Sequence, residues 1–244
     1  VRGGIVIVPE LYHLFTLRRV DESVKMHVAV GTSLATIIPT SLLSARAHAN
    51  KGNLDSALLK SLVPALVVGV ILGALISGYV PGLVLSAVFG IVGLLVAANM
   101  ALRAQPAQLA STMPTGLARH GIGIGIGGFS TLMGIGGGTL SVPIFNGFSV
   151  PMHRAVGTAA AIGVIISIPG ALGFLISGLN VPGRPPLTIG YVNLFGFALI
   201  VPMTMLMAPV GARLAHTINA RLLKRAFAVF LSITALRMLY NVFG

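Results

Sequence analysis

Three consecutive glycines are the residues of this sequence best suited to chemistry, and that chemistry is the binding of an anion. Gly136, Gly137 and Gly138 interrupt an apolar stretch directly before Thr139. Adjacent glycines favour a break in a helix, and the piece after the break would begin with unpaired backbone N–H groups. Such groups, together with the helix dipole, attract negative charge. The pattern therefore predicts an anion site formed by Gly136, Gly137, Gly138 and Thr139.

A second glycine block near the start of the sequence repeats this pattern. Residues 3–9 read GGIVIVP, and residues 137–143 read GGTLSVP. Gly3 and Gly4 are therefore predicted to add backbone N–H groups to the same site. Arg2 stands where the second block has Gly136, and a guanidinium group beside a helix N-terminus is a strong ligand for an anion. Arg2 is equally compatible with a position in solvent or among lipid head groups.

Close helix packing is the alternative role of these glycines, because a residue without a side chain lets two helices approach each other. It applies to the triple glycine and, with more weight, to the earlier glycines that are spaced by two. These earlier glycines are Gly121, Gly123, Gly125 and Gly127.

Each half of the sequence also carries a Gly-Thr pair near the start of an apolar segment. Thr32 and Ser33 follow Gly31, and Thr158 follows Gly157. Hydroxyl groups donate hydrogen bonds to an oxyanion without adding charge. Thr32, Ser33 and Thr158 are therefore predicted binding residues, with bonding to the carbonyls of their own helix as the alternative.

Catalytic and metal-binding constellations are not visible. The four carboxylates, Glu10, Asp21, Glu22 and Asp55, all lie in the first 55 residues, and the sequence contains no cysteine. The histidines lack the spacing of metal ligands. We therefore expect no paired acid–base catalysis, no metal site and no cofactor, so an enzyme is the weaker hypothesis.

The elements that would position these residues are membrane-spanning helices. Of the 244 residues, 55% are hydrophobic and 8% are charged, and residues 61–102 contain no charged side chain. About 20 apolar residues of helix cross a hydrocarbon core. The fold class is therefore an all-α, polytopic membrane protein. The predicted spans are 27–45, 57–78, 83–102, 117–134, 155–178, 188–209 and 222–243, with a tight helical hairpin at 78–82.

The net charge of +12 belongs to the loops between these spans. Short basic loops are typical of membrane proteins, whose lipid head groups they meet, so a nucleic-acid partner is not expected. Alternating the loops across the membrane, with each broken helix crossing once, puts Lys51 and Arg154 on opposite sides. The two sides then carry similar numbers of basic residues, and the orientation stays open.

The repeated blocks indicate a tandem duplication. The glycine blocks are 134 positions apart and the Gly-Thr pairs are 126 positions apart, in the same order. Residues 1–102 are the predicted first repeat, 103–116 a polar linker and 117–244 the second repeat, each repeat with a broken or re-entrant helix. Because residues 117–134 precede the second glycine block, we expect an equivalent apolar segment upstream of the first block.

These residues resemble the sulfite exporter family, also called the TauE/SafE or toluene-sulfonate uptake permease family. The resemblance rests on GIGGGTLSVP at 134–143, on GGIVIVP at 3–9 and on the Gly-Thr pairs at 31–32 and 157–158. It covers nearly the whole chain, and it departs from the family pattern at Arg2, where glycine is expected. It implies a multi-pass transporter, in bacteria of the inner membrane, for sulfite, sulfoacetate or related organosulfonates.

The leading hypothesis is therefore a secondary transporter that binds a small sulfur-containing anion between its two repeats. A channel, a transporter for a different small anion and a membrane-embedded enzyme are the alternatives. Expected partners are the anion and membrane lipid. A homo-oligomer is compatible with the sequence, which identifies neither the oligomeric state nor a coupling ion.

Overall fold

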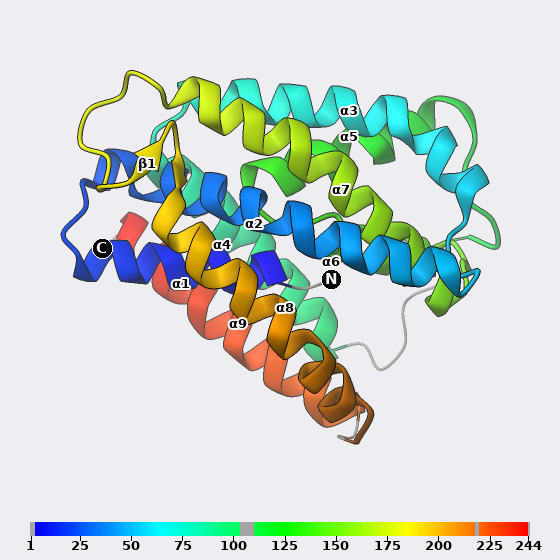
Figure 1. Cartoon of the computed structure of the whole chain (residues 1–244). Coiled ribbons are helices and arrows are strands. Elements are labelled where there is room, and N and C mark those ends of the chain that lie inside the picture. Colours follow the sequence, from blue (N-terminus) through cyan, green and yellow to red (C-terminus); the bar gives the residue numbers. More distant parts are fainter. Residues whose placement is uncertain (1–2, 103–109, 218–219, 244) are drawn as a thin grey trace.

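The chain is almost entirely helical in the computed structural model, which describes residues 3–102, 110–217 and 220–243 (Figure 1). Two strands of two residues each, β1 (Thr188–Ile189) and β2 (Val192–Asn193), form an antiparallel hairpin. The prediction of an all-α fold is confirmed. The helices are α1 (Gly3–Leu17), α2 (Glu22–Asn50), α3 (Ser56–Tyr79), α4 (Gly82–Leu102), α5 (Gly116–Leu132), α6 (Gly138–Gly147), α7 (Met152–Ser177), α8 (Leu194–Thr217) and α9 (Ala220–Phe243).

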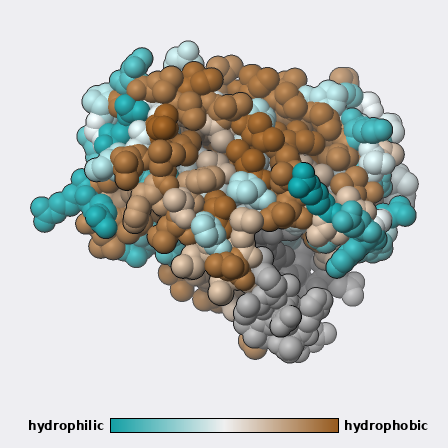
Figure 2. Space-filling view, viewed as in Figure 1, coloured by the Kyte–Doolittle hydropathy of each residue, from teal (hydrophilic) through white to brown (hydrophobic). Residues whose placement is uncertain are grey.

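Five helices in the described ranges, α2, α3, α4, α7 and α9, are long and apolar enough to cross a membrane. Apolar side chains cover the middle of the face in Figure 2, while hydrophilic side chains gather at its left and right ends. This banded surface is the one that a bilayer requires. The prediction of a multi-pass membrane protein is confirmed.

Local signals set several helix boundaries. Asp21 accepts a hydrogen bond from the Ser23 N–H at 2.9 Å and caps α2, which therefore begins five residues before the predicted span at 27. The predicted helical hairpin at 78–82 is confirmed, since α3 ends at Tyr79 and α4 begins at Gly82. The predicted span at 188–209 begins too early. Gly190, with φ +56°, turns the β1–β2 hairpin instead, and α8 begins at Leu194.

Helix α2 forms the centre of the molecule, and its residues from Val24 to Ile37 are all buried. A helix that is buried on every side must suit neighbours on every side. It packs against α1, α4, α7 and α8.

Glycines on α5 meet α3 backbone to backbone. A Cβ at Gly127 would lie 2.3 Å from the Leu66 carbonyl oxygen, and one at Gly123 would lie 2.7 Å from the Ala65 Cβ. Gly121 and Gly125 face open space. Close packing therefore accounts for two of the four evenly spaced glycines.

Helices α5 and α6 bring the chain back to the end of the molecule at which Ala110, just before α5, lies. The Ala110 N–H, before α5, donates to the Gly147 carbonyl at the end of α6 at 3.3 Å, and the Ser149 hydroxyl donates to the Ala110 carbonyl at 3.1 Å. Helix α7 then begins beside residues 51–55. Arg154 therefore lies at the same end of the molecule as Lys51, and the expectation of opposite sides is wrong, because α5 and α6 together bring the chain back to Ala110.

The two ends of the molecule are named here by their loops. The turn end contains residues 51–55, and the hairpin end contains β1 and β2; they lie at opposite ends of α2 (Figure 1). The proposed halves interlock between these ends, since α3 packs on α5, α2 on α7 and α4 on α9. The first half of the predicted linker, residues 103–109, lies outside the described residues.

Candidate functional site

The two glycine blocks meet in the structure. The helix is interrupted at the predicted place, because α5 ends at Leu132 and α6, of 10 residues, begins at Gly138. The N-terminus of α1 lies directly against this break. A Cβ at Gly4 would lie 2.8 Å from both the carbonyl oxygen of Gly134 and the Cα of Ile135. Only glycine permits this approach of α1 to the break.

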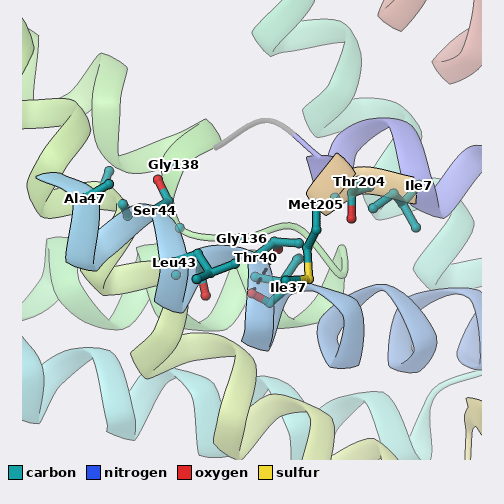
Figure 3. Close-up of a pocket in the computed structure, with 16 residues that line it drawn as sticks. Ile7, Ile37, Thr40, Leu43, Ser44, Ala47, Gly136, Gly138, Thr204 and Met205 are labelled. Atoms are coloured by element: carbon teal, nitrogen blue, oxygen red, sulfur yellow. Dashed lines mark hydrogen bonds between the residues drawn. The ribbon is translucent and has the colours of Figure 1, made fainter. Parts of the chain in front are cut away.

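Beside the break lies a cavity of about 490 Å³ (Figure 3). Five parts of the chain form its wall: α1, α2, the break with the start of α6, α7 and α8. Its lining residues are Gly4, Ile7, Ile37, Thr40, Ser41, Leu43, Ser44, Ala47, Gly136, Gly137, Gly138, Ala159, Ala160, Gly163, Thr204 and Met205. The cavity thus combines both glycine blocks with a row of small side chains.

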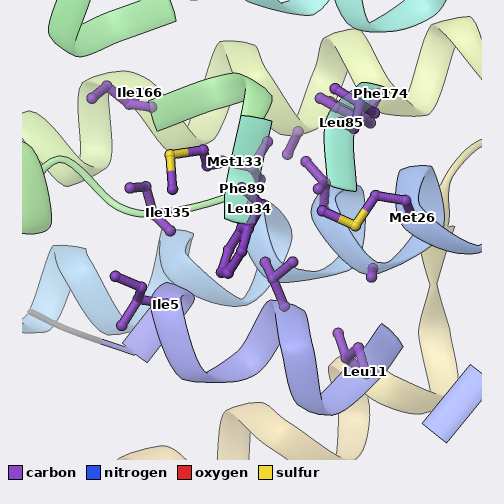
Figure 4. Packing of buried hydrophobic residues seen from close by; sticks show 14 of the residues in the cluster. Ile5, Leu11, Met26, Leu34, Leu85, Phe89, Met133, Ile135, Ile166 and Phe174 are labelled. Carbon is purple, nitrogen blue, oxygen red and sulfur yellow. The ribbon is translucent and has the colours of Figure 1, made fainter. Parts of the chain in front are cut away.

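Apolar packing holds the break in position. Met133 and Ile135, on either side of Gly134, are fully buried in the cluster that also contains Ile5 of α1 and Leu34 of α2 (Figure 4). Gly134 has φ +63°, a conformation that glycine adopts without strain. The break is therefore a fixed element of the core.

The backbone at the break supplies unpaired donors. Within the described residues, no hydrogen bond is found for the N–H groups of Gly136, Gly137 and Gly138, although all three glycines are buried. No side chain caps the N-terminus of α6. A buried N–H group without a partner is costly, and a bound anion would satisfy it.

Hydroxyl groups supply the remaining polar lining. Thr40 donates to the Thr36 carbonyl at 3.0 Å, and Thr204 donates to the Ile200 carbonyl at 2.8 Å. No partner of the Ser44 hydroxyl is found in the part of the chain that the structure describes. None of the described lining residues is ionisable. Neutral donors and the α6 dipole therefore set the electrostatics of the cavity.

The structure separates the predicted binding residues into two groups. Gly4, Gly136, Gly137 and Gly138 line the cavity, and Gly3 begins α1 next to Gly4. Arg2 lies outside the described residues. The predicted hydroxyl groups of Thr32, Ser33, Thr139 and Thr158 do not line the cavity.

Three of these hydroxyls have partners elsewhere. The Ser33 hydroxyl donates to the Gly134 carbonyl at 2.7 Å and so supports the break. The Thr32 hydroxyl accepts from the Asn193 N–H at 2.9 Å, and the Thr158 hydroxyl accepts from the Asp55 N–H at 3.0 Å. The alternative was that each hydroxyl bonds to a carbonyl of its own helix. The hydrogen bonds found for these three hydroxyls are of a different kind, because each partner is more than 100 residues away in sequence.

Thr40, Ser41, Ser44 and Thr204 are lining residues that the predicted set does not contain. A signal for two of them is present in the sequence, because Thr40 and Ser44 continue the helical row that starts at Ser33 and Thr36. Thr204 carries no comparable signal, since its neighbours in the cavity come from other helices.

A second hollow, of about 1060 Å³, lies between α1 and α8. Its wall is mostly apolar and includes the oppositely charged side chains of Glu10 and Arg18. It contains none of the predicted binding residues, so the smaller cavity is the better candidate. Among the described residues there is also no group of His, Asp and Glu that could hold a metal ion.

Long apolar helices and a helix break in the core together define an α-helical, multi-pass membrane protein. The sulfite exporter TauE/SafE family model matches residues 2–238, so the chain belongs to this family. It is therefore a membrane transporter.

Three relatives carry names of the same kind. A probable membrane transporter protein of Haemophilus influenzae is 31% identical over 98% of this chain and 90% of the relative. A probable membrane transporter protein of Methanocaldococcus jannaschii is 27% identical over 95% and 84%, respectively. YunE of Bacillus subtilis, also a probable membrane transporter protein, is 28% identical over 98% and 90%. No solved structure shows significant similarity to the chain.

Proposed function

We propose that this protein is a secondary transporter of a small sulfur-containing anion, such as sulfite, sulfoacetate or another organosulfonate. The anion would bind in the cavity beside Gly136, Gly137 and Gly138. In a bacterium, the protein would work in the inner membrane of the cell. The family name supports the sulfur chemistry of the substrate.

One observation carries the proposal: three consecutive unpaired N–H groups border a cavity that the N-terminus of α1 also reaches. Two helix N-termini, at Gly3 and Gly138, direct the positive ends of their dipoles toward this region. A sulfur oxyanion offers several acceptor oxygens for such donors. No lining residue is ionisable, so the anion would form no ion pair in the cavity. An ion pair would slow the release of the anion.

Transport would follow from movement of the interlocked halves around the cavity. The sequence contains no ATP-binding motif, so a gradient across the membrane or a partner protein would supply the driving force. The backbone donors stay in place when side chains move. The Thr40 hydroxyl can rotate from the carbonyls of its own helix to the anion, and the Ser44 hydroxyl can donate to the anion as well.

The double variant Thr40→Val, Ser44→Ala tests the site. We expect protein reconstituted in liposomes to exchange labelled sulfite in saturable counterflow, and the double variant to raise the KM about tenfold. A typical hydrogen bond contributes a net of about 0.5–1.5 kcal/mol. Loss of two bonds at about 0.7 kcal/mol each weakens binding about tenfold. The measurement is the initial rate of counterflow at a series of sulfite concentrations.

Thr234→Val is the matched control. Its hydroxyl donates to the Phe230 carbonyl at 2.7 Å, as the Thr40 hydroxyl does within α2, but Thr234 lies on α9 and does not line the cavity. Its KM should equal that of the parent. An equal rise in both proteins would contradict the site, flux without counterflow would indicate a channel, and absence of any sulfite or sulfonate flux in the parent would contradict the substrate class.

A further inference from the structure

The Gly-Thr pair on α2 forms a tight joint with the start of α8. Thr32, fully buried, accepts a hydrogen bond from the backbone N–H of Asn193 at 2.9 Å. A Cβ at Gly31 would lie 2.5 Å from the Tyr191 carbonyl oxygen, so only glycine allows this contact. Thr32 comes from the first half of the chain and Asn193 from the second. We call this contact the hairpin-end joint.

The Gly-Thr pair on α7 forms the same contact with the start of α3. Thr158, fully buried, accepts from the backbone N–H of Asp55 at 3.0 Å. A Cβ at Gly157 would lie 2.1 Å from the Asn53 carbonyl oxygen. Here the threonine comes from the second half and its partner from the first. We call this contact the turn-end joint.

The two joints are equivalent in detail. Asp55 and Asn193 are 138 positions apart, and each caps its helix by accepting from the N–H three residues ahead, at 3.0 and 2.8 Å. Three residues before each cap stands a glycine in the left-handed region, Gly52 with φ +67° and Gly190 with φ +56°. The halves are thus linked twice, crosswise and at opposite ends of the molecule.

The joints differ in their relation to the cavity. The cavity reaches the surface toward the turn end, where Leu43 and Ala47 of its lining are exposed. Along α2 it stops at Ile37 toward the hairpin end, and from there back to Val24 every residue of α2 is buried. Beside α1, Ile7 lines both this cavity and the hollow between α1 and α8, and that hollow ends against Asn193 of the joint. The hairpin-end joint lies within this packed stretch. Its threonine fixes α2 to the loop before α8, and α8 itself carries Thr204 of the cavity wall.

We propose that the hairpin-end joint is the seal that closes the cavity toward that side of the membrane, with Thr32 as its positioning residue. Thr32 acts on the substrate path through α2 and α8 and does not contact the substrate. In this state the turn-end joint links the halves without closing the cavity. The inference rests on the proposed transport function, since it treats the cavity as the substrate path.

The absence of cysteine from the sequence allows a direct test. Ser41, buried and part of the cavity wall, is replaced by cysteine as a single reporter in the full chain. Protein in liposomes is then treated with a membrane-impermeant maleimide added from one side at a time, in the absence of substrate. Reporters at exposed Lys51 and Leu187 identify which side is the turn end and which is the hairpin end.

We expect Thr32→Val, which keeps the shape of threonine but loses the acceptor, to raise the labelling rate from the hairpin side about fivefold. This factor corresponds to the typical strength of one side-chain hydrogen bond inside a membrane protein. Labelling from the turn side should change little. Thr32→Ser keeps the hydroxyl and should label at the rate of the parent, a rescue that loss of packing alone would not give.

Thr158→Val is the matched control, because it removes the same hydrogen bond at the other joint. It should leave labelling from the hairpin side at the rate of the parent. The seal is refuted if Thr32→Val labels like the parent from the hairpin side, if Thr158→Val raises this rate equally, or if Thr32→Ser behaves like Thr32→Val. Thr32→Ala, judged by the same outcomes, replaces Thr32→Val if the latter does not elute as folded protein. Labelling needs no transport, so a parent that labels as expected without moving sulfite would contradict the proposed substrate alone.

Discussion

Gly134→Ala is expected to abolish transport and to lower the melting temperature of the purified protein by roughly 10 °C. Alanine in the left-handed region costs about 1–2 kcal/mol, and Gly134 has φ +63°. In addition, the new Cβ would lie 2.9 Å from the Val30 Cα and 3.0 Å from the Val8 Cγ2. It would therefore push α1 and α2 away from the break, and overpacking of this kind adds about 1–3 kcal/mol.

Gly116→Ala separates the two causes of this effect. Gly116 has nearly the same conformation, with φ +62°, but a Cβ at this position would have no atom within 4 Å. Gly116→Ala should incur only the conformational cost, which lowers the melting temperature by roughly 3 °C. Its transport activity should be unchanged. Thermal unfolding in detergent and counterflow in liposomes measure both variants. Equal losses in the two proteins would show that close contact at the break does not stabilise the fold.

Gly127→Ala is the second substitution with a large expected effect. Its Cβ would lie 2.3 Å from the Leu66 carbonyl oxygen, an approach of two backbones that side-chain rotation cannot relieve. Helices α3 and α5 must therefore separate, and we expect a loss of about 3 kcal/mol, at the upper end of overpacking. Most of the protein should then elute as aggregate after extraction in detergent.

Gly125→Ala, two residues away on the same helix, is expected to have the opposite sign. No atom lies within 4 Å of a Cβ at Gly125, and alanine is favoured over glycine in a helix by about 1 kcal/mol. The comparison is made by gel filtration and by the melting temperature of the extracted protein. Similar behaviour of the two variants would contradict the packing of α5 on α3.

Features that depend on short stretches of chain were predictable from the sequence. Hydropathy defines helices that a membrane must bury, and the hairpin at 78–82 follows from glycine and proline alone. The interruption between Leu132 and Gly138 has the same origin, because three glycines disfavour a continuous helix wherever it lies. Gly4 and residues 136–138, which belong to the two repeated glycine blocks, line one cavity in the structure.

The contacts of the hydroxyl residues could not be predicted from short stretches of chain. Thr32 and Thr158 occupy helix positions that suit ligand binding as well as helix contacts, and only the partner distinguishes the two. Those partners, Asn193 and Asp55, are 161 and 103 residues away in sequence. The lining residue Thr204 was missed for the same reason, because its place in the cavity wall depends on how α8 packs against α2.

The sequence by itself determined that this protein is helical, lies in a membrane and contains a glycine break able to present backbone N–H groups, because composition, hydropathy and glycine content act locally. Only the tertiary structure decided that the chain returns to the turn end between α5 and α6, which hydroxyls reach the cavity, and that the halves cross at two joints. Contacts between segments more than 100 residues apart depend on the packing of all the helices at once, and no local pattern encodes them.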